Sequence, residues 1–148
     1  MRIRKFRKED ARNVSDLIRK CLREVNSKDY SKKVIDFMTS HFSHKTIIAN
    51  SEKRQIFVAV EKEKIIGTAS IHDDVILTVF VNPKIQGEGI GKKLMAKVEN
   101  EAKKNGFKSV KLPSSITAID FYKKLGYKKV KEKYEENFGK TIIMRKIL

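Results

Sequence analysis

The sequence has few of the residues that build cross-links or sharp chain breaks: its 148 residues include one cysteine, two prolines, seven glycines and no tryptophan. The lone Cys21 permits no disulfide within the chain. The histidines His41, His44 and His72 have no cysteine partners at zinc-site spacing, so we expect no metal site. The scarcity of proline and glycine excludes collagen-like and Pro/Gly-rich disordered chains.

Long hydrophobic segments are also missing. No window approaches the run of at least about 18 apolar residues that a membrane-spanning helix requires. The N-terminal segment 1–6 is interleaved with charge and lacks the hydrophobic region of a signal peptide. We therefore expect a cytoplasmic protein that does not associate with membranes.

Acidic residues are outnumbered: 34 Lys and Arg stand against 18 Asp and Glu, a net charge of +16. Such a charge favours anionic partners and raises their rate of encounter. The basic residues are spread over the whole chain and form no single stripe, however. A generally basic surface explains this pattern, so we do not expect nucleic acid as a partner.

The apolar residues that are present, 40% of the chain, suffice for one core, and this length is typical of one domain. We predict a single domain over residues 1–148. Apolar residues recur at spacings of three and four over 10–25, which predicts a helix there, and Ser31 is placed to cap a second helix that reaches Phe42.

The other elements follow from similar patterns. We expect strands over 2–6, 56–60, 65–71, 75–81, 109–112, 127–130 and 141–148, helices over 89–104 and 117–125, and a charged excursion over 131–140. The order βααβββαβαββ predicts a mixed α/β fold, in which a central, mostly antiparallel sheet of about seven strands is flanked by about four helices.

A glycine cluster, Gln86–Gly91, separates a hydrophobic strand from an amphipathic helix. Glycine lets an anion approach the backbone, N–H donors converge at a helix start, and the helix dipole adds about half a positive charge there. The cluster is not a P-loop, because Gln86 replaces that motif's first glycine and Lys93 its hydroxyl residue. Its glycines are spaced evenly by two, unlike a dinucleotide fingerprint. A turn that binds nothing is the alternative.

The same residues resemble a known family. Gln86-Gly87-Glu88-Gly89-Ile90-Gly91 matches the Q/R-x-x-G-x-G/A motif of the GNAT superfamily of N-acetyltransferases, and the preceding segment 79–83 is similar to the end of that family's fourth strand. The segment Ser115–Tyr127 is similar to the family's second motif, N-x-x-A-x-x-F-Y-x-x-x-G-F. The resemblance covers essentially the whole chain and implies a GNAT-like fold with acetyl-CoA as co-substrate.

The resemblance also implies how acetyl-CoA would be held. Backbone N–H groups of the turn would bind the diphosphate, and the pantetheine arm would pair like an added strand in a gap between the strands 75–81 and 109–112. A backbone N–H near Val79 would polarise the thioester carbonyl, a catalytic role. The implied cofactor-binding residues are Val79, Phe80, Val81, Gln86, Gly87, Glu88, Gly89, Ile90, Gly91, Lys92, Ser115, Ala118 and Tyr122.

Tyr122 is the expected catalytic acid. A phenol with an ordinary pKa of about 10 is protonated at neutral pH and can donate to a departing thiolate, whose pKa is about 8.5. Ala118 lies one helical turn before it and leaves room for the cofactor. An ordinary core tyrosine is the alternative. Ser115 stands where the family often has asparagine, and either a pantetheine contact or a helix cap fits it.

No general base is evident from the sequence. The central strands are largely apolar, and the nearest candidates, His72, Asp73 and Asp74, read equally as a plain turn. Without a base, amines of low pKa are favoured, and the net charge disfavours polycationic acceptors. The resemblance implies an acceptor pocket drawn largely from the first two helices, which would include Glu24, Asp29, Tyr30 and Asp36. A solvated helix surface is the alternative for these residues.

We therefore expect an N-acetyltransferase that moves the acetyl group of acetyl-CoA directly to a primary amine of a small molecule or a protein. A noncatalytic CoA-binding module within an assembly is the alternative. The acceptor, a homodimeric or other oligomeric state, and acetyl against a longer acyl group are left open by the sequence.

Overall fold

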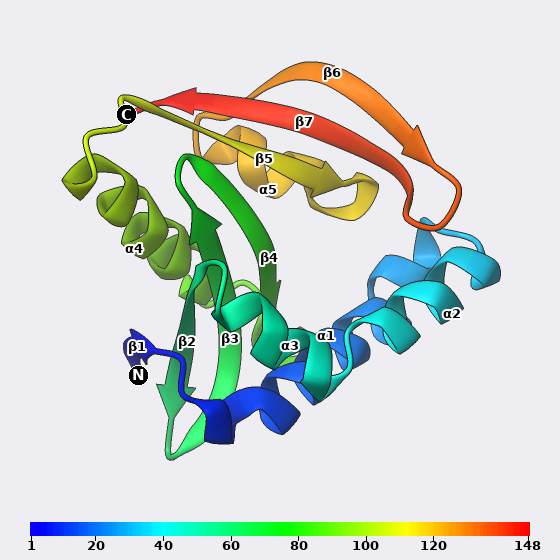
Figure 1. Ribbon diagram of the computed structural model, residues 1–148. Coiled ribbons are helices and arrows are strands. Elements are labelled where there is room, and N and C mark those ends of the chain that lie inside the picture. The colour runs from blue at the N-terminus through cyan, green and yellow to red at the C-terminus, as the bar shows by residue number, and fades with distance from the viewer.

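The structure is a computed structural model that describes residues 1–148. Its seven strands form one sheet in the order β1-β2-β3-β4-β5-β7-β6 (Figure 1). The strands are β1 (Arg2–Lys5), β2 (Gln55–Glu61), β3 (Lys64–His72), β4 (Val75–Val81), β5 (Ser109–Ser115), β6 (Lys128–Glu135) and β7 (Gly139–Ile147). All neighbours are antiparallel except β4 and β5, as the predicted mixed sheet requires.

Five α-helices accompany the sheet. They are α1 (Ala11–Glu24), α2 (Lys32–His41), α3 (His44–Ser51), α4 (Ile90–Lys104) and α5 (Ile119–Lys124). The stripe predicted for the first helix is buried as expected, and Ser31 caps α2 by accepting a hydrogen bond from the Val34 N–H at 3.3 Å. None of the helices is both long and apolar enough to span a membrane.

The sheet separates two hydrophobic cores. Along β2, Phe57 and Ala59 belong to the core under α4 and α5, whereas Ile56, Val58 and Val60 belong to the core under α1, α2 and α3. This alternation follows from the period of two in a strand. Because both faces of the central strands are covered, these strands read as continuous apolar runs in the sequence.

Three elements differ from the prediction. Strand β5 continues beyond its expected end at Leu112 to Ser115, which pairs with Thr141 of β7. The predicted order lacks α3, a short helix that buries Ile47 alone and is capped by Ser43, which accepts from the Thr46 N–H at 3.3 Å. The expected charged excursion over 131–140 is wrong: β6 continues to Glu135 and turns directly into β7. Every residue of β6 is exposed, so the strand carries no apolar alternation that the sequence could reveal.

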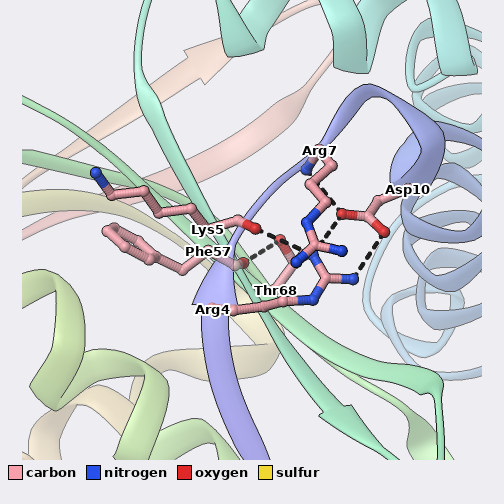
Figure 2. A network of polar contacts seen from close by, with 6 residues as sticks. All are labelled: Arg4, Lys5, Arg7, Asp10, Phe57 and Thr68. Atoms are coloured by element: carbon pink, nitrogen blue, oxygen red, sulfur yellow. Dashed lines mark hydrogen bonds and ion pairs between the residues drawn. The ribbon is translucent and has the colours of Figure 1, made fainter.

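A polar network fixes β1 to the start of α1 (Figure 2). The Arg4 guanidinium donates two hydrogen bonds to the Asp10 carboxylate, at 2.8 and 2.9 Å, and the Arg7 N–H donates a third at 2.8 Å. These contacts hold the pKa of Asp10 below its usual range, with the Arg4 hydrogen bond as the largest cause. The network therefore holds β1, a strand at the edge of the sheet, to the start of α1.

The parallel pair β4 and β5 is joined at one end only. Val75 pairs with Lys111, the Lys111 N–H donates to the Asp74 carbonyl at 2.9 Å, and no later residue of β4 pairs with β5. Beyond this point the strands diverge, as Figure 1 shows for β4 and β5. The gap expected between the strands is therefore present.

Candidate active site

The turn after β4 is closed by side chains that bond to its backbone. Asn82 accepts a hydrogen bond from the Lys84 N–H at 3.0 Å and begins a short 3-10 turn, Pro83–Ile85. Gln86 donates from Nε2 to the Val81 carbonyl at 3.2 Å and so spans the turn. Gln86, predicted as a cofactor contact, thus has a structural bond of its own.

The backbone N–H groups that follow have no partner. The first hydrogen bond of α4 runs from the Lys93 N–H to the Gly89 carbonyl at 3.1 Å, and the N–H groups from Gly87 to Lys92 donate to no group in the chain. Most of these residues are exposed. Unpaired donors at the positive end of a helix form a site for an anion.

The three glycines serve two purposes. Gly87 and Gly89 have φ values of +91° and +82°, and no atom lies within 4 Å of where a Cβ would stand, so backbone conformation alone requires glycine there. At Gly91 a Cβ would lie 3.0 Å from Cζ of Phe121. A residue without a side chain is therefore needed at position 91, because Phe121 of α5 packs against α4 there. This contact brings the two sequence motifs together in space.

A cavity of about 1120 Å³ opens beside the turn, between α1 and α2 on one side and β4, β5, β6 and β7 on the other. Ten of the predicted site residues line it: Val79, Phe80, Val81, Gln86, Gly87, Ile90, Gly91, Ser115, Ala118 and Tyr122. Glu88, Gly89 and Lys92 do not line the cavity and lie exposed on the turn. The structure thus brings most of the set together.

Strand β4 carries a bulge in its pairing with β3, beside the gap toward β5. Between Thr68 and Ser70 of β3 the register shifts by one extra residue of β4, and Thr78 takes a φ of +55°, an uncommon conformation for a β-branched residue. Bulges of this kind redirect backbone groups. Val79, which follows directly, therefore stands at a position where the strand edge departs from the regular ladder and faces the cavity.

Tyr122 is nearly buried, at 6% exposure, and lines the cavity. Burial raises its pKa, and no hydrogen bond contributes to that shift. Its neighbour Tyr127, in contrast, donates its hydroxyl to Glu99 at 2.7 Å. The Tyr122 hydroxyl is thus the one of the two that has no partner within the fold.

Ser115 acts as a cap. Its Oγ accepts a hydrogen bond from the Ala118 N–H at 3.2 Å and begins the 3-10 turn Ile116–Ala118 that precedes α5. The same residue lines the cavity. Of the two roles that the sequence left open, the capping role is therefore realised, and a pantetheine contact remains a prediction.

The base candidates of the turn lie elsewhere. His72, Asp73 and Asp74 do not line the cavity, and His72 Nδ1 lies 3.0 Å from the Lys53 carbonyl. No group of three or more His, Cys, Asp or Glu side chains is placed to hold a metal ion.

The expected acceptor residues are only partly gathered. Tyr30 lines the cavity; its hydroxyl accepts from the Ile116 N–H at 2.8 Å and donates to the Lys140 carbonyl at 2.7 Å. Burial raises the pKa of Tyr30. Glu24, Asp29 and Asp36 lie outside the cavity lining.

Other lining residues have no sequence signal. His41 packs among aromatic rings, with its centroid 5.5 Å from that of Phe138 and 5.0 Å from that of Phe42. The charged lining residues are Arg54, Lys111, Lys131, Lys133, Glu135 and Arg145. Sequence reasoning missed them because cross-strand register, which sets their face, is not visible in one strand's pattern.

Comparison with known proteins shows the family of this chain. The acetyltransferase (GNAT) domain family matches residues 18–148, and the chain therefore belongs to that family. An uncharacterized N-acetyltransferase of Methanocaldococcus jannaschii is 36% identical over 83 residues, which are 54% of this chain. The match spans only 29% of that relative's length.

Solved structures share the fold at low identity. A GCN5-related N-acetyltransferase from Rhodopseudomonas palustris has a TM-score of 0.93 at 21% identity, over 99% of this chain and 95% of that one. PaiA N-acetyltransferase from Thermoplasma acidophilum, solved in complex with coenzyme A, has a TM-score of 0.83 at 22% identity, over 99% of this chain and 98% of that one. The predicted GNAT-like fold is confirmed.

Proposed function

We propose that residues 1–148 act as one domain, an N-acetyltransferase that moves the acetyl group of acetyl-CoA directly to a primary amine. The observation that carries the proposal is the run of unpaired N–H groups over Gly87–Lys92 beside a cavity that holds the free edge of β4 and Tyr122. Membership of the GNAT family and the coenzyme A complex of the T. acidophilum PaiA enzyme support the same donor.

The donor would lie along β4. The N–H groups of Gly87–Lys92 would hold its diphosphate, with Lys92 and Lys93 adding charge. The pantetheine arm fits the gap beyond Val75, where β4 has no partner strand. At its reactive end the N–H of Val79 would polarise the thioester carbonyl and stabilise the oxyanion that forms there.

Transfer needs no covalent enzyme intermediate. Cys21 is the thiol that lines the cavity, and burial raises its pKa to about 12, so it is protonated and a poor nucleophile. Its Sγ also donates to the Val81 carbonyl at 3.2 Å. The amine nitrogen therefore attacks the thioester carbon itself.

Tyr122 supplies a proton to the sulfur. As the carbon–nitrogen bond forms and the carbon–sulfur bond breaks, the sulfur leaves with the bonding electron pair and takes the phenol proton. Burial raises the pKa of Tyr122, so a bare phenolate is disfavoured and the proton that the amine nitrogen loses must reach Tyr122 as its own departs. Solvent in the cavity would carry that proton.

The amine has to arrive uncharged. No carboxylate of β4 or β5 lines the cavity to accept its proton. At pH 7, removing a proton from an alkylammonium of pKa 10.4 costs about 4 to 5 kcal/mol, against about 1 kcal/mol for an α-amino group. Amines of low pKa are therefore the expected substrates.

Thiol release from acetyl-CoA, measured against a broad panel of amines, tests the proposal. We expect turnover with at least one amine, and calorimetry should show saturable binding of CoA. If purified protein ignores acetyl-CoA at millimolar concentration, the proposal is wrong. Binding of CoA without turnover on any amine would instead favour a noncatalytic CoA-binding module.

A further inference from the structure

The lining of the cavity is strongly basic. Its charged residues are Arg54, Lys111, Lys131, Lys133 and Arg145 against the single carboxylate of Glu135, a greater excess than the 34 to 18 of the whole chain. None of these five cations forms an ion pair, although carboxylates pair with lysines elsewhere on the surface, as in the contact of Lys129 with Glu132 at 2.6 Å.

Strand register sets like charges side by side in the wall that β5 and β7 form. Lys111 of β5 pairs with Arg145 of β7, and Arg145 pairs on its other side with Lys128 of β6, which lies outside the cavity lining. Paired residues of adjacent strands point to the same face, and like charges directly opposite one another destabilise a sheet. This row therefore costs stability unless an anion lies over it.

A second part of the lining brings one more cation toward this row. Arg54 precedes β2, and its side chain reaches Thr78 in the middle of β4. Its Nη1 lies 3.4 Å from Oγ1 of Thr78, and it has no carboxylate partner. Burial alone lowers the pKa of Arg54, which marks a cation that has lost water without gaining a counterion.

The donor's phosphates do not account for Lys111 and Arg145. The row of Lys111 aligns with Val75, whereas the glycine turn follows Val81 at the opposite end of β4. Six residues of strand at about 3.3 Å each separate the two ends by about 20 Å. The part of the donor that would lie between them, the pantetheine arm, is uncharged. An anion that binds at this end would therefore belong to the acceptor.

We propose, as a refinement that rests on the acetyltransferase function above, that the acceptor is a compact amine carrying a carboxylate or phosphate group, and that Arg54, Lys111 and Arg145 bind that group. Arg54 contacts Thr78, which directly precedes Val79, so the anion lies only a short way from the acetyl group. Amine and anion are then a few bonds apart, as in an amino acid or an aminoalkyl phosphate.

The same cations help the chemistry. Positive charges near an amine disfavour its ammonium form. The wall therefore shifts the bound amine toward the neutral, nucleophilic state that a cavity without a base on β4 or β5 requires. It also repels polycationic acceptors.

Matched acceptor pairs test the proposal. Thiol release is measured with α-amino acids and their amides, with aminoalkyl phosphates and the corresponding amino alcohols, and with spermidine. We expect the acidic compound of one pair to be a better substrate than its uncharged analogue. A preference for the amino acids identifies the bound group as a carboxylate, and a preference for the aminoalkyl phosphates identifies it as a phosphate. Lys111→Gln, Arg145→Gln and Arg54→Gln should each raise KM for that substrate about 10- to 100-fold, as loss of one charge-assisted hydrogen bond implies.

Two controls accompany the variants. In these variants the Kd for CoA should not change, and KM for the neutral analogue should change much less than KM for the acidic substrate. Lys103→Gln, which replaces an exposed lysine of the last turn of α4 without an ion pair, should leave all three constants unchanged. Thermal unfolding checks the fold: because Lys111→Gln and Arg145→Gln remove repulsion between like charges, Tm should stay the same or rise.

The outcomes separate the two proposals. If neutral or cationic amines turn over as well as acidic ones, or the variants leave KM unchanged, the acidic acceptor is refuted while the acetyltransferase function stands. A loss of CoA affinity in the variants would assign the cations to the donor and also refute it. Absence of turnover on every amine refutes the acetyltransferase function and the acceptor class with it.

Discussion

Replacing Gly89 with alanine isolates what the glycine turn contributes to CoA binding. No atom lies within 4 Å of where its Cβ would stand, so alanine meets no clash and the cost is the left-handed backbone conformation at φ +82°. That conformation costs a non-glycine residue about 1–2 kcal/mol. The N–H groups from Gly87 to Lys92 make no bonds within the chain, and Gly89 is tied to α4 only through its carbonyl, which accepts from the Lys93 N–H at 3.1 Å.

In the absence of CoA, the turn of the variant can therefore leave the left-handed conformation. The cost of restoring that conformation then appears as weaker binding of CoA. We expect the Kd for CoA to rise about 5- to 30-fold, with little change in the free energy of unfolding. Isothermal titration calorimetry gives the first quantity, and urea unfolding gives the second.

Gly106→Ala is the matched control. Gly106 has a φ of +88°, and it too has nothing within 4 Å of a Cβ. It lies at the far end of α4, whose 15 residues span about 22 Å. There the chain is held, because the Gly106 N–H donates to the Lys103 carbonyl and the Phe107 N–H to the Ala102 carbonyl, both at 3.0 Å. This variant should lose about 1–2 kcal/mol of stability and keep its CoA affinity.

Unchanged CoA affinity in Gly89→Ala would refute the reasoning, because the turn would then bind no part of the carrier. An equal loss of affinity in both variants would also refute it, since a distant glycine cannot contact the diphosphate.

Three further predictions concern single side chains. Tyr122→Phe should lower kcat about 100-fold or more with an unchanged Kd for CoA, as expected for loss of a general acid; an equal fall in CoA affinity would make it a packing residue. Asp10→Asn should reduce the free energy of unfolding by about 2 to 3 kcal/mol at pH 7, because the Arg4 guanidinium loses a charged partner. The pKa of Asp10 is lowered in the fold, so its contribution is complete above the ordinary carboxyl range and is lost as the pH falls toward the lowered value; urea unfolding at pH 7 and pH 3 should therefore show the variant losing less stability on acidification than the parent. Cys21, with its pKa raised to about 12, should react with iodoacetamide at pH 8 far more slowly in the native protein than in urea, and rapid native labelling would contradict its assignment as an inert thiol.

Elements with a clear apolar period were predictable from the sequence. The buried stripe of α1 and the glycine cluster before α4 specify their structure through spacing alone. The helix α3 was missed because only Ile47 is buried, so its period is weak, although Ser43 was a usable capping signal. The strand β6 was shortened because exposure of both faces removes the alternation on which prediction depends.

The residues of the candidate site also differ in how far the sequence could predict them. Residues carried by local motifs, such as Gly87 and Tyr122, were named from the sequence and lie at the cavity. The basic wall was not, because Lys111 and Arg145 are far apart in the chain and become neighbours only through the register of β5 and β7. The net charge of the chain indicated a preference for anionic partners but could not show where on the protein an anion would bind.

The central claim is that unpaired N–H groups of the glycine turn grip the diphosphate of acetyl-CoA while the edge of β4 receives its arm. Titration of ¹⁵N-labelled protein with acetyl-CoA, followed by amide NMR shifts, tests this most directly. We expect the largest shifts at Gly87–Lys92 and Val79–Val81, with small shifts at Gly106. Saturating acetyl-CoA that leaves those amides unmoved, or moves others instead, would contradict it.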